Sequence, residues 1–319
     1  ENPMETRKLY YEDPFQKGFA TTVVSCDAVK GGYAVVLAET AFYPEGGGQP
    51  YDTGVLGEAN VLEVHEKNGV ITHLCDKPLE VGKSVSGKID WARRFDHMQQ
   101  HSGEHICSGL ICERFHCDNV GFHMGADVVT IDFNADISWD ELMEIEQLAN
   151  LYIYEDHPID IQFYRGAELD KVEYRSKKPL EGDVRIVSFP GADCCACCGT
   201  HVVRSGQVGL VKFLSVQKFR DGVRIELLSG KRAHRYLSEC WAQDVRIAQA
   251  LSVKPNASFA GVERVLAELS ALKQRCAKLE ESVFAQTAAQ YEGKGDVLLF
   301  EDEMSGDSLR KLCDAVTNH

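Results

Sequence analysis

Two kinds of hydrophobic pattern divide the chain. Up to about residue 90, short apolar runs alternate with turn residues, as in Thr21–Ser25 and Tyr33–Leu37, which flank a Gly-Gly pair. Val61–His65 and Val70–Leu74 flank an Asn-Gly pair, the strongest hairpin signal in the chain. Short strands at this spacing indicate a small barrel or sandwich. We expect a small N-terminal β-barrel subdomain over residues 1–90.

Helical periodicity begins near Asp90 and is then interleaved with strands. Arg93–Phe115 predicts a helix, and Ser138–Glu141 is a capping box that begins a second helix. The strands expected in this region are Val128–Phe133, Ile159–Tyr164, Val184–Phe189 and Val208–Ser215. Because no regular βαβ rhythm is present, the pattern predicts an α+β domain over residues 91–235.

The last part of the chain is helical. An apolar stripe from Leu237 to Leu251 ends at a Lys-Pro-Asn break. A second stripe follows in alternating steps of three and four residues, which is a heptad pattern, through Val262, Val265, Leu269, Leu272, Cys276, Leu279 and Val283. We expect a helical hairpin over residues 236–291 whose seam either forms a homodimer or packs within the hairpin. A strand at Val297–Phe300 and a helix at Leu309–Val316 then begin an α/β tail, residues 292–319.

Composition narrows the class of protein. At 319 residues the chain is long enough for several cores, and no apolar run approaches a membrane span. Twelve cysteines without a secretory signal indicate a reducing cytoplasm with thiols available for metal. A formal charge of −15 argues against broad nucleic-acid affinity but leaves room for a local basic patch. Candidates for such a patch are Arg93, Arg94, Lys218, Arg220, Lys231, Arg232 and Arg235.

Two pairs of potential metal ligands stand far apart in the sequence. His101 and His105 form one pair, Cys197 and His201 the other, and each pair has the spacing i, i+4 that places side chains on one face of a helix. Three imidazoles and a thiolate suit tetrahedral Zn²⁺. The alternatives are that each pair packs separately, or that the zinc is purely structural. Glu104 lies between the histidines and is a candidate general base, although on a helix it points to another face.

A glycine-rich segment is the second candidate site. Gly46, Gly47 and Gly48 precede Gln49, and consecutive glycines let a backbone approach a ligand closely. The alternative is a wide turn in the barrel. The segment lacks the Lys-Ser/Thr ending of a nucleotide-binding P-loop.

Together these motifs resemble the editing domain of alanyl-tRNA synthetase and its freestanding AlaX-type relatives. The resemblance covers about residues 10–235 and rests on the glycine motif followed by Asp52-Thr53-Gly54, on both ligand pairs, and on Ser205–Leu210 and Gly222–Glu226. The C-terminal helices and tail resemble the linker and the start of a DHHA1 domain in the long AlaX form. No aminoacylation domain precedes the editing region, which favours a freestanding editor.

The chain departs from this family at two places. Cys198 stands where the family usually has glycine, and Val120–Gly125 stands where many synthetase editing domains carry a Gln-x-Gly-Ser pattern. Cys198 offers an extra thiol beside the ligand pair, although the i, i+4 spacing selects Cys197. The second departure puts in question the contacts that select the amino acid side chain.

The resemblance implies an enzyme that hydrolyses the ester between serine or glycine and the 3′ adenosine of mischarged tRNA(Ala). It implies one Zn²⁺ per chain on the four ligands above, with the metal positioning the substrate because no coordination position stays open. Selecting serine over alanine needs a polar group that the serine hydroxyl satisfies. The candidate catalytic residues are Gln49, Glu104, Thr130 and His123. The candidate substrate-binding residues are Gly46, Gly47, Gly48, Gln49, Arg93 and Arg94.

Three other functions remain open from the sequence. A zinc hydrolase of small esters or amides would act without tRNA. A tRNA-binding module with a structural zinc would bind tRNA and leave Ser-tRNA(Ala) intact. A dimerisation protein would account for the heptad seam but not for the ligand pairs.

Overall fold

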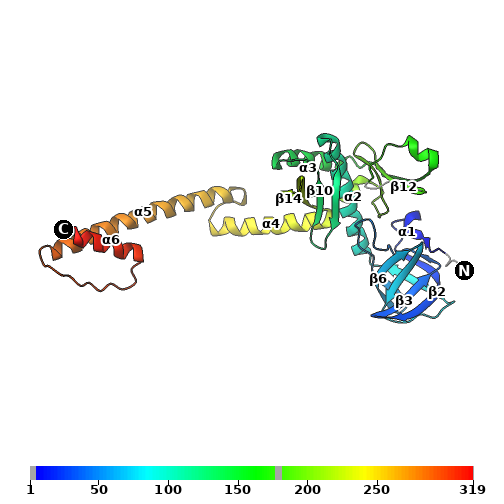
Figure 1. Cartoon of the computed structure of the whole chain (residues 1–319), viewed down its shortest axis with the longest axis horizontal. Helices are drawn as coiled ribbons and strands as arrows, with labels where there is room; N and C mark the ends of the chain where they lie inside the picture. Colours follow the sequence, from blue (N-terminus) through cyan, green and yellow to red (C-terminus); the bar gives the residue numbers. More distant parts are fainter. Residues whose placement is uncertain (1–4, 177–181, 319) are drawn as a thin grey trace. The chain divides into compact units, whose positions relative to one another are not determined.

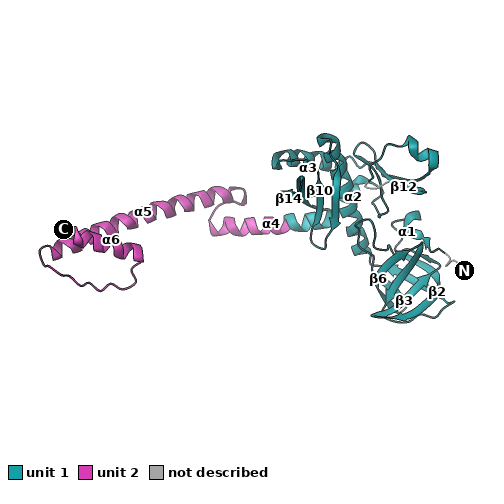
Figure 2. Cartoon of the chain, viewed as in Figure 1, with its two compact units in different colours: residues 1–237 teal, residues 238–319 magenta. Residues whose placement is uncertain are grey.

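The chain folds into two compact units. The computed structural model describes residues 5–176 and 182–318, and contacts divide the chain into Glu1–Leu237 (unit 1) and Ser238–His319 (unit 2) (Figures 1 and 2). Unit 1 contains every described strand, and unit 2 is helical. The α+β class that the sequence predicts is confirmed. Among the described residues, no helix combines the length and apolarity that a membrane crossing requires.

The first 90 residues form antiparallel strands that close into a barrel. The order around the barrel is β2-β3-β7-β6-β5-β8. Asn68 and Gly69 both have positive φ, so the two-residue turn between β6 and β7 has the form expected of an Asn-Gly pair. The barrel strands are β2 (Gly18–Val29), β3 (Gly32–Leu37), β5 (Gly54–Leu56), β6 (Ala59–Lys67), β7 (Val70–Cys75) and β8 (Ser84–Ile89).

Alternate positions of these strands face inward. The core includes Val23, Val35, Val61 and Ile71, all at most 2% exposed. Two short elements, β1 (Arg7–Lys8) and the helical turn α1 (Leu9–Glu12), precede the barrel strands. Strand β1 pairs in parallel with β4 (Glu39–Thr40), which follows β3.

The rest of unit 1 is built around one long helix, α2 (Trp91–Phe115). It contacts strands of two antiparallel sheets and the helix α3 (Trp139–Tyr154). The four-stranded sheet has the order β14 (Val211–Phe219), β15 (Gly222–Ser229), β10 (Val129–Phe133) and β9 (Asn119–Met124). The three-stranded sheet has the order β11 (Asp160–Arg165), β12 (Asp183–Phe189) and β13 (Asp193–Ala196).

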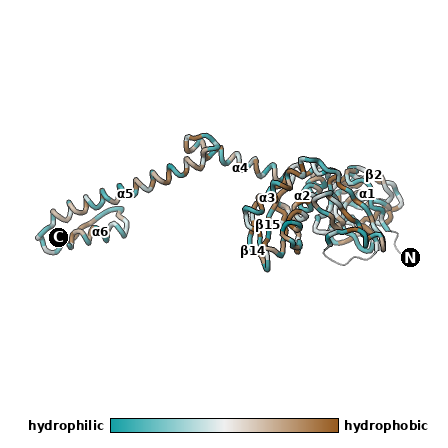
Figure 3. The backbone as a smooth tube through the Cα atoms, turned by 90° about the horizontal axis from the view of Figure 1, so that it is seen from above, coloured by the Kyte–Doolittle hydropathy of each residue, from teal (hydrophilic) through white to brown (hydrophobic). Residues whose placement is uncertain are grey.

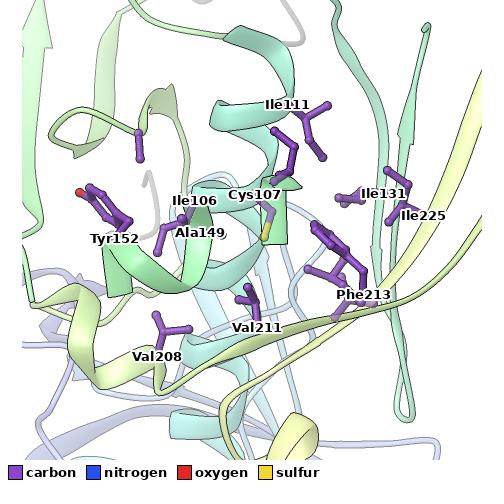
Figure 4. Close-up of a cluster of buried hydrophobic side chains, with 14 of the residues drawn as sticks. Ile106, Cys107, Ile111, Ile131, Ala149, Tyr152, Val208, Val211, Phe213 and Ile225 are labelled. Carbon is purple, nitrogen blue, oxygen red and sulfur yellow. The ribbon is translucent and has the colours of Figure 1, made fainter. Parts of the chain in front are cut away.

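A second hydrophobic core lies between α2 and these elements. Figure 4 shows Cys107 and Ile111 of α2 on the side of Ile131 and Phe213 of the four-stranded sheet, and Ile106 next to Ala149 of α3. Trp91, at the start of α2, packs against this core and against the barrel core. The two cores are therefore joined at the first residue of the helix.

Several elements differ from the sequence prediction. The strand expected from Val208 begins at Val211, because Ser205–Val208 forms a 3₁₀ turn, η2, that ends at Gly209 with φ of 85°. A further 3₁₀ turn, η1 (Gly166–Lys171), follows β11. The sequence did not predict β9, β13 or β15, which are paired strands in the structure.

The C-terminal helices are α4 (Gly230–Ala250), α5 (Ser258–Tyr291) and α6 (Gly306–Thr317), with the 3₁₀ turn η3 (Pro255–Ala257) after α4. Helix α6 packs on α5. Hydrophobic and hydrophilic segments alternate along α5 (Figure 3), and heptad positions Leu269 and Leu272 are 45% and 56% exposed.

The strand predicted at Val297–Phe300 is wrong. These residues have no regular secondary structure, and Leu298 and Phe300 are largely exposed. A strand needs a neighbour to pair with its backbone, and the described part of unit 2 offers none.

His73 is a buried ionisable group in the barrel. Its Nδ1 donates to the Val35 carbonyl over 3.0 Å, and the Thr40 hydroxyl lies 2.8 Å from Nε2. Burial lowers the pKa of His73 to about 4 from a usual 6.5. Between these values the unfolded state binds more protons than the folded state. The stability that depends on neutral His73 is therefore present above pH 6.5 and is lost as the pH falls towards 4.

We predict that His73→Gln makes the stability of unit 1 less sensitive to acid. Between pH 7 and pH 5, His73 should lower the free energy of unfolding of the natural chain by about 2 kcal/mol. Urea unfolding at the two pH values measures this difference. His65→Gln on the neighbouring strand changes an exposed histidine and is the matched control. Equal acid sensitivity of the natural chain and His73→Gln would contradict the prediction.

Candidate metal centre

The structure brings the four predicted ligands together. His101 and His105 lie one turn apart on α2, and Cys197 and His201 lie on the segment after β13. One ligand atom from each residue lies within 4.8 Å of the others. Cys197 Sγ is 3.5 Å from His101 Nε2 and 3.3 Å from His201 Nε2. Three imidazole nitrogens and a sulfur around one point form a donor set that suits a tetrahedral metal ion.

The second ligand pair lies on a loop and not on a helix. Residues 197–201 have no helical turn, so helix geometry does not explain why Cys197 and His201 lie together as it does for His101 and His105. The loop passes directly over His101: a Cβ atom at Gly199 would overlap the His101 ring and the Gln49 amide. The Gly199 N–H also points back to Cys197 Sγ at 3.3 Å. The absence of a side chain at Gly199 therefore lets the loop approach the His101 ring closely, with Cys197 and His201 both near His101.

Hydrogen bonds to the other ring nitrogens orient the histidines. His105 Nδ1 donates to Asp193 Oδ2 over 2.8 Å, and Arg175 holds both Asp193 oxygens at 2.7 and 2.8 Å. His201 Nδ1 lies 3.3 Å from Ser102 Oγ. A partner on the outer nitrogen fixes the tautomer and the ring plane of a metal-binding histidine.

Gln49 performs the same task for His101. Its Oε1 accepts from His101 Nδ1 at 2.9 Å and from the Thr200 N–H at 3.0 Å, while its Nε2 donates to Thr200 Oγ1 at 2.8 Å. The side chain is fully buried. The structure thus places Gln49 behind His101, where it links the barrel to the ligand loop.

The electrostatic surroundings favour a thiolate at Cys197. Burial raises the pKa of this thiol, but the charges of His101, His201 and His105 outweigh burial, so that its pKa lies well below the ordinary value. A thiolate is the form of cysteine that binds metals.

The ligand group opens into a cavity of about 440 Å³. Gly48, with φ of 82°, approaches so closely that a Cβ atom there would overlap the Phe122 ring. Phe122 in turn stacks on His101, with ring centroids 5.2 Å apart. The lining residues are Gly47, Gly48, His101, Glu104, His105, Asn119, Phe122, Arg175, Ser176, Asp183, Val184, Arg185, Cys195, Ala196, Cys197 and Cys198.

Glu104 belongs to this cavity although it was expected on another helix face. It is three residues after His101, a spacing that keeps two side chains adjacent on a helix. Its Oε1 accepts from Ser108 Oγ at 2.5 Å and from Asn119 Nδ2 at 2.9 Å. Its Oε2 makes no hydrogen bond to any residue within 5–176 or 182–318.

Other predicted site residues lie elsewhere. Thr130 and His123 face each other across β10 and β9 and do not line the cavity. Gly46 is outside the lining and bridges to Gln49. Arg94 is fully buried against Asp52 and the carbonyls of Pro14 and Ala41, which leaves it no surface for a substrate.

Several site residues could not be found from the sequence. Asp193, Cys195 and His105 form a second group of possible ligand atoms that shares His105 with the first. Asp193 directly precedes Cys194 and Cys195 in the sequence, which is a weak signal, and Arg175 has none. Cys198 joins neither group among the described residues; its carbonyl accepts from Tyr11.

Family models match both parts of this site. Residues 9–93, which contain the glycine motif, match the model described as tRNA synthetases class II (A). Residues 184–226, which contain Cys197 and His201, match the model described as the threonyl and alanyl tRNA synthetase second additional domain.

Similar proteins fall into two groups. The chain is 35% identical to an alanine–tRNA ligase of Pyrococcus abyssi over 96% of its own length, but spans only about a third (35%) of that protein. It is 30% identical to alanyl-tRNA editing protein Aarsd1-A of Xenopus laevis, with 89% of the chain aligned to 73% of the relative. It is 31% identical to alanyl-tRNA editing protein AlaX-L of Pyrococcus horikoshii, with 92% aligned to 74%. The chain belongs to the family of alanyl-tRNA editing proteins, to which the matching part of alanine–tRNA ligases is related.

Proposed function

We propose that the chain is an editing hydrolase that deacylates tRNA(Ala) mischarged with serine or glycine. The observation that carries this proposal is a metal-ligand group that opens into a cavity beside Gly47 and Gly48, instead of being enclosed. The names of the related editing proteins support the same substrate class. The chain spans about a third of the matching ligase. The proposal therefore concerns hydrolysis by this chain and does not extend to the ligase reaction.

The metal we propose is one Zn²⁺ per chain, held by His101, His105, Cys197 and His201. When bound, it would supply a fixed positive charge beside the aminoacyl-adenosine end, and four protein ligands would leave no coordination position for a water. All twelve cysteines are free thiols in the structure, which supports a reducing cytoplasm as the place of action.

The residues around the cavity have separate tasks in this reaction. Gly47 and Gly48 bring a backbone without side chains close to the substrate. Glu104 accepts the proton of the attacking water on Oε2 while Ser108 and Asn119 hold Oε1. The water oxygen bonds to the ester carbonyl carbon, the bond to the 3′ oxygen breaks, and the proton passes to that oxygen. Thr130 and His123 do not line the cavity, so we assign neither of them a contact with the serine hydroxyl.

The deacylation rates of Ser-, Gly- and Ala-tRNA(Ala) test this function. We expect hydrolysis of the serine or glycine ester and little hydrolysis of the alanine ester. Glu104→Gln should lower kcat on the favoured ester by about 10²–10⁴-fold, the usual size of general-base catalysis. The substitution keeps an oxygen for Ser108 and Asn119, so it changes the base and preserves the hydrogen bonds.

Two rival functions predict different results in the same assay. A binding module retains Ser-tRNA(Ala) and leaves it intact. A hydrolase of small esters cleaves a minimal seryl ester as fast without tRNA as with it.

Removing the metal with a chelator should abolish deacylation and adding Zn²⁺ should restore it. Full activity of a verified metal-free chain would contradict the zinc proposal.

Asp193 should control how tightly the metal is held. We predict that Asp193→Asn weakens Zn²⁺ binding by about 10–100-fold, because the carboxylate that orients His105 is lost. Competition against a chromophoric chelator measures the affinity. Asp183→Asn removes a carboxylate from the same cavity without touching His105. Equal affinity of the two variants would show that Asp193 does not act through His105.

We further propose that the heptad seam of α5 forms a homodimer, and that residues 292–319 begin a DHHA1-like region. Exposed apolar positions along α5 support a partner for this helix. Leu269→Asp with Leu272→Asp should convert a dimer to a monomer in light scattering. Both residues are exposed in the single chain, so its fold should survive. Lys273→Asp, at an exposed position on the same helix, is the control. An unchanged mass of the leucine variant would exclude the seam as the dimer contact.

A further inference from the structure

A second cavity, of about 420 Å³, lies at the beginning of α2. The first turns of α2 and α4 and the turn between β9 and β10 form its walls. Its charged and titratable lining residues are Arg93, Asp96, His97, Lys231, Arg232 and Arg235. Among the described residues, none lines both this cavity and the cavity at the metal centre.

This cavity is strongly basic in a chain whose formal charge is −15. Arg232 is held by Asp96, with Nη2 2.7 Å from a carboxylate oxygen, and donates to the Gly125 carbonyl. Lys231 and Arg235 form no ion pair with any residue that the structure describes. Their charges remain available to a ligand.

Arg93 is held in place without losing its charge. Its Nε donates to the Tyr51 carbonyl over 2.9 Å, and the guanidinium lies 5.4 Å from the Tyr51 ring centroid. No carboxylate within 5–176 or 182–318 is paired with it. Three cations of the cavity therefore have no acidic partner in the part of the chain that the structure describes.

His97 gives a second, independent indication of a ligand. His97 lines the cavity and is only 3% exposed, and its Nδ1 is buried without a hydrogen-bond partner among the residues that the structure describes. Buried polar atoms are nearly always paired, so an orphan nitrogen on a residue that lines a basic cavity indicates a missing partner. Burial, helped by the charge of Arg93, lowers the pKa of His97 to about 4. The ring is therefore neutral near pH 7 and offers an N–H to an anion.

The position of the cavity along α2 relates it to the metal centre. His97 precedes the ligand His101 by four residues, and Arg93 precedes it by eight. At 1.5 Å per residue these offsets are about 6 and 12 Å along the helix axis. These distances are short enough for an extended RNA strand bound at one cavity to reach the other.

We propose that this cavity binds a backbone phosphate of the RNA strand whose esterified end enters the metal-side cavity. The proposal rests on the proposed function. A cavity of about 420 Å³ is larger than a single ion needs and is of the size that holds part of a larger ligand. The acidic chain as a whole disfavours approach to an extended anionic surface such as a membrane, whereas a recessed basic cavity can take one phosphate.

Binding of deacylated tRNA(Ala) tests the proposal without any hydrolysis. We expect the pair Lys231→Gln and Arg235→Gln to raise Kd about tenfold or more and to lower the slope of log Kd against log salt by about 1, the value for one phosphate contact. Fluorescence anisotropy over roughly 50–200 mM salt measures both quantities. Lys30→Gln with Lys77→Gln removes the same charge from exposed barrel turns and should change neither.

His97→Phe separates the neutral donor from the charges. It keeps a ring in the cavity, and we expect it to raise Kd without changing the salt slope. Thermal melting and bound Zn²⁺ verify that each variant is folded. A mutant pair that binds tRNA like the natural chain, or no more weakly than the barrel control, would overturn the proposal.

Two further measurements identify the ligand. The first compares the Lys231→Gln and Arg235→Gln pair with the natural chain in binding inorganic phosphate and phosphatidylserine vesicles. If the pair loses either of these but keeps its affinity for tRNA, the cavity is a site for a free ion or a membrane, and the RNA proposal is overturned. A natural chain that leaves all aminoacyl-tRNAs intact but shows the expected binding pattern would overturn the proposed function while supporting the phosphate site.

Discussion

The burial of a polar helix is the constraint on which unit 1 depends. The middle of α2, from His97 to Gly109, is buried at every position, and many of these residues are polar. Buried polar groups must find partners, and those of α2 find them on segments distant in sequence. Gln100 exchanges hydrogen bonds with the Ser229 backbone, and Ser102 accepts from the Val202 N–H. The helix therefore determines where the end of β15 and the ligand loop lie.

The metal centre follows from the same constraint. The outer nitrogen of His101 is held by Gln49 of the barrel, and that of His105 by Asp193 of β13. One turn of helix thus joins the barrel to the smaller sheet through the two rings that hold the ligand nitrogens. The buried pair of Arg94 with Asp52 secures the barrel to the start of the helix. Removing one partner of such a pair typically costs about 3–5 kcal/mol, because a buried charge is left alone.

Local signals were the predictable ones. The Asn68-Gly69 turn and the capping box at Ser138 act within a few residues, and both are present in the structure. The helix with His101 was predictable from periodicity. The ligand pair after β13 was found from spacing, but its loop was not, because Gly199 is required by an imidazole 98 positions away in sequence. Contacts of this kind leave no periodic trace. Neither the Asp193–Arg175 pair nor the task of Gln49 could be inferred without the fold.

Arg93 and Arg94 show why charge in a sequence does not locate a binding site. They are adjacent, yet a helix of 3.6 residues per turn directs neighbouring side chains about 100° apart. Arg94 faces the barrel and is neutralised by Asp52. Arg93 faces a cavity where no described carboxylate pairs with it. What a polyanion can use is the charge left unpaired in a recess. A chain with a formal charge of −15 can therefore present a basic site to one strand while repelling other anions.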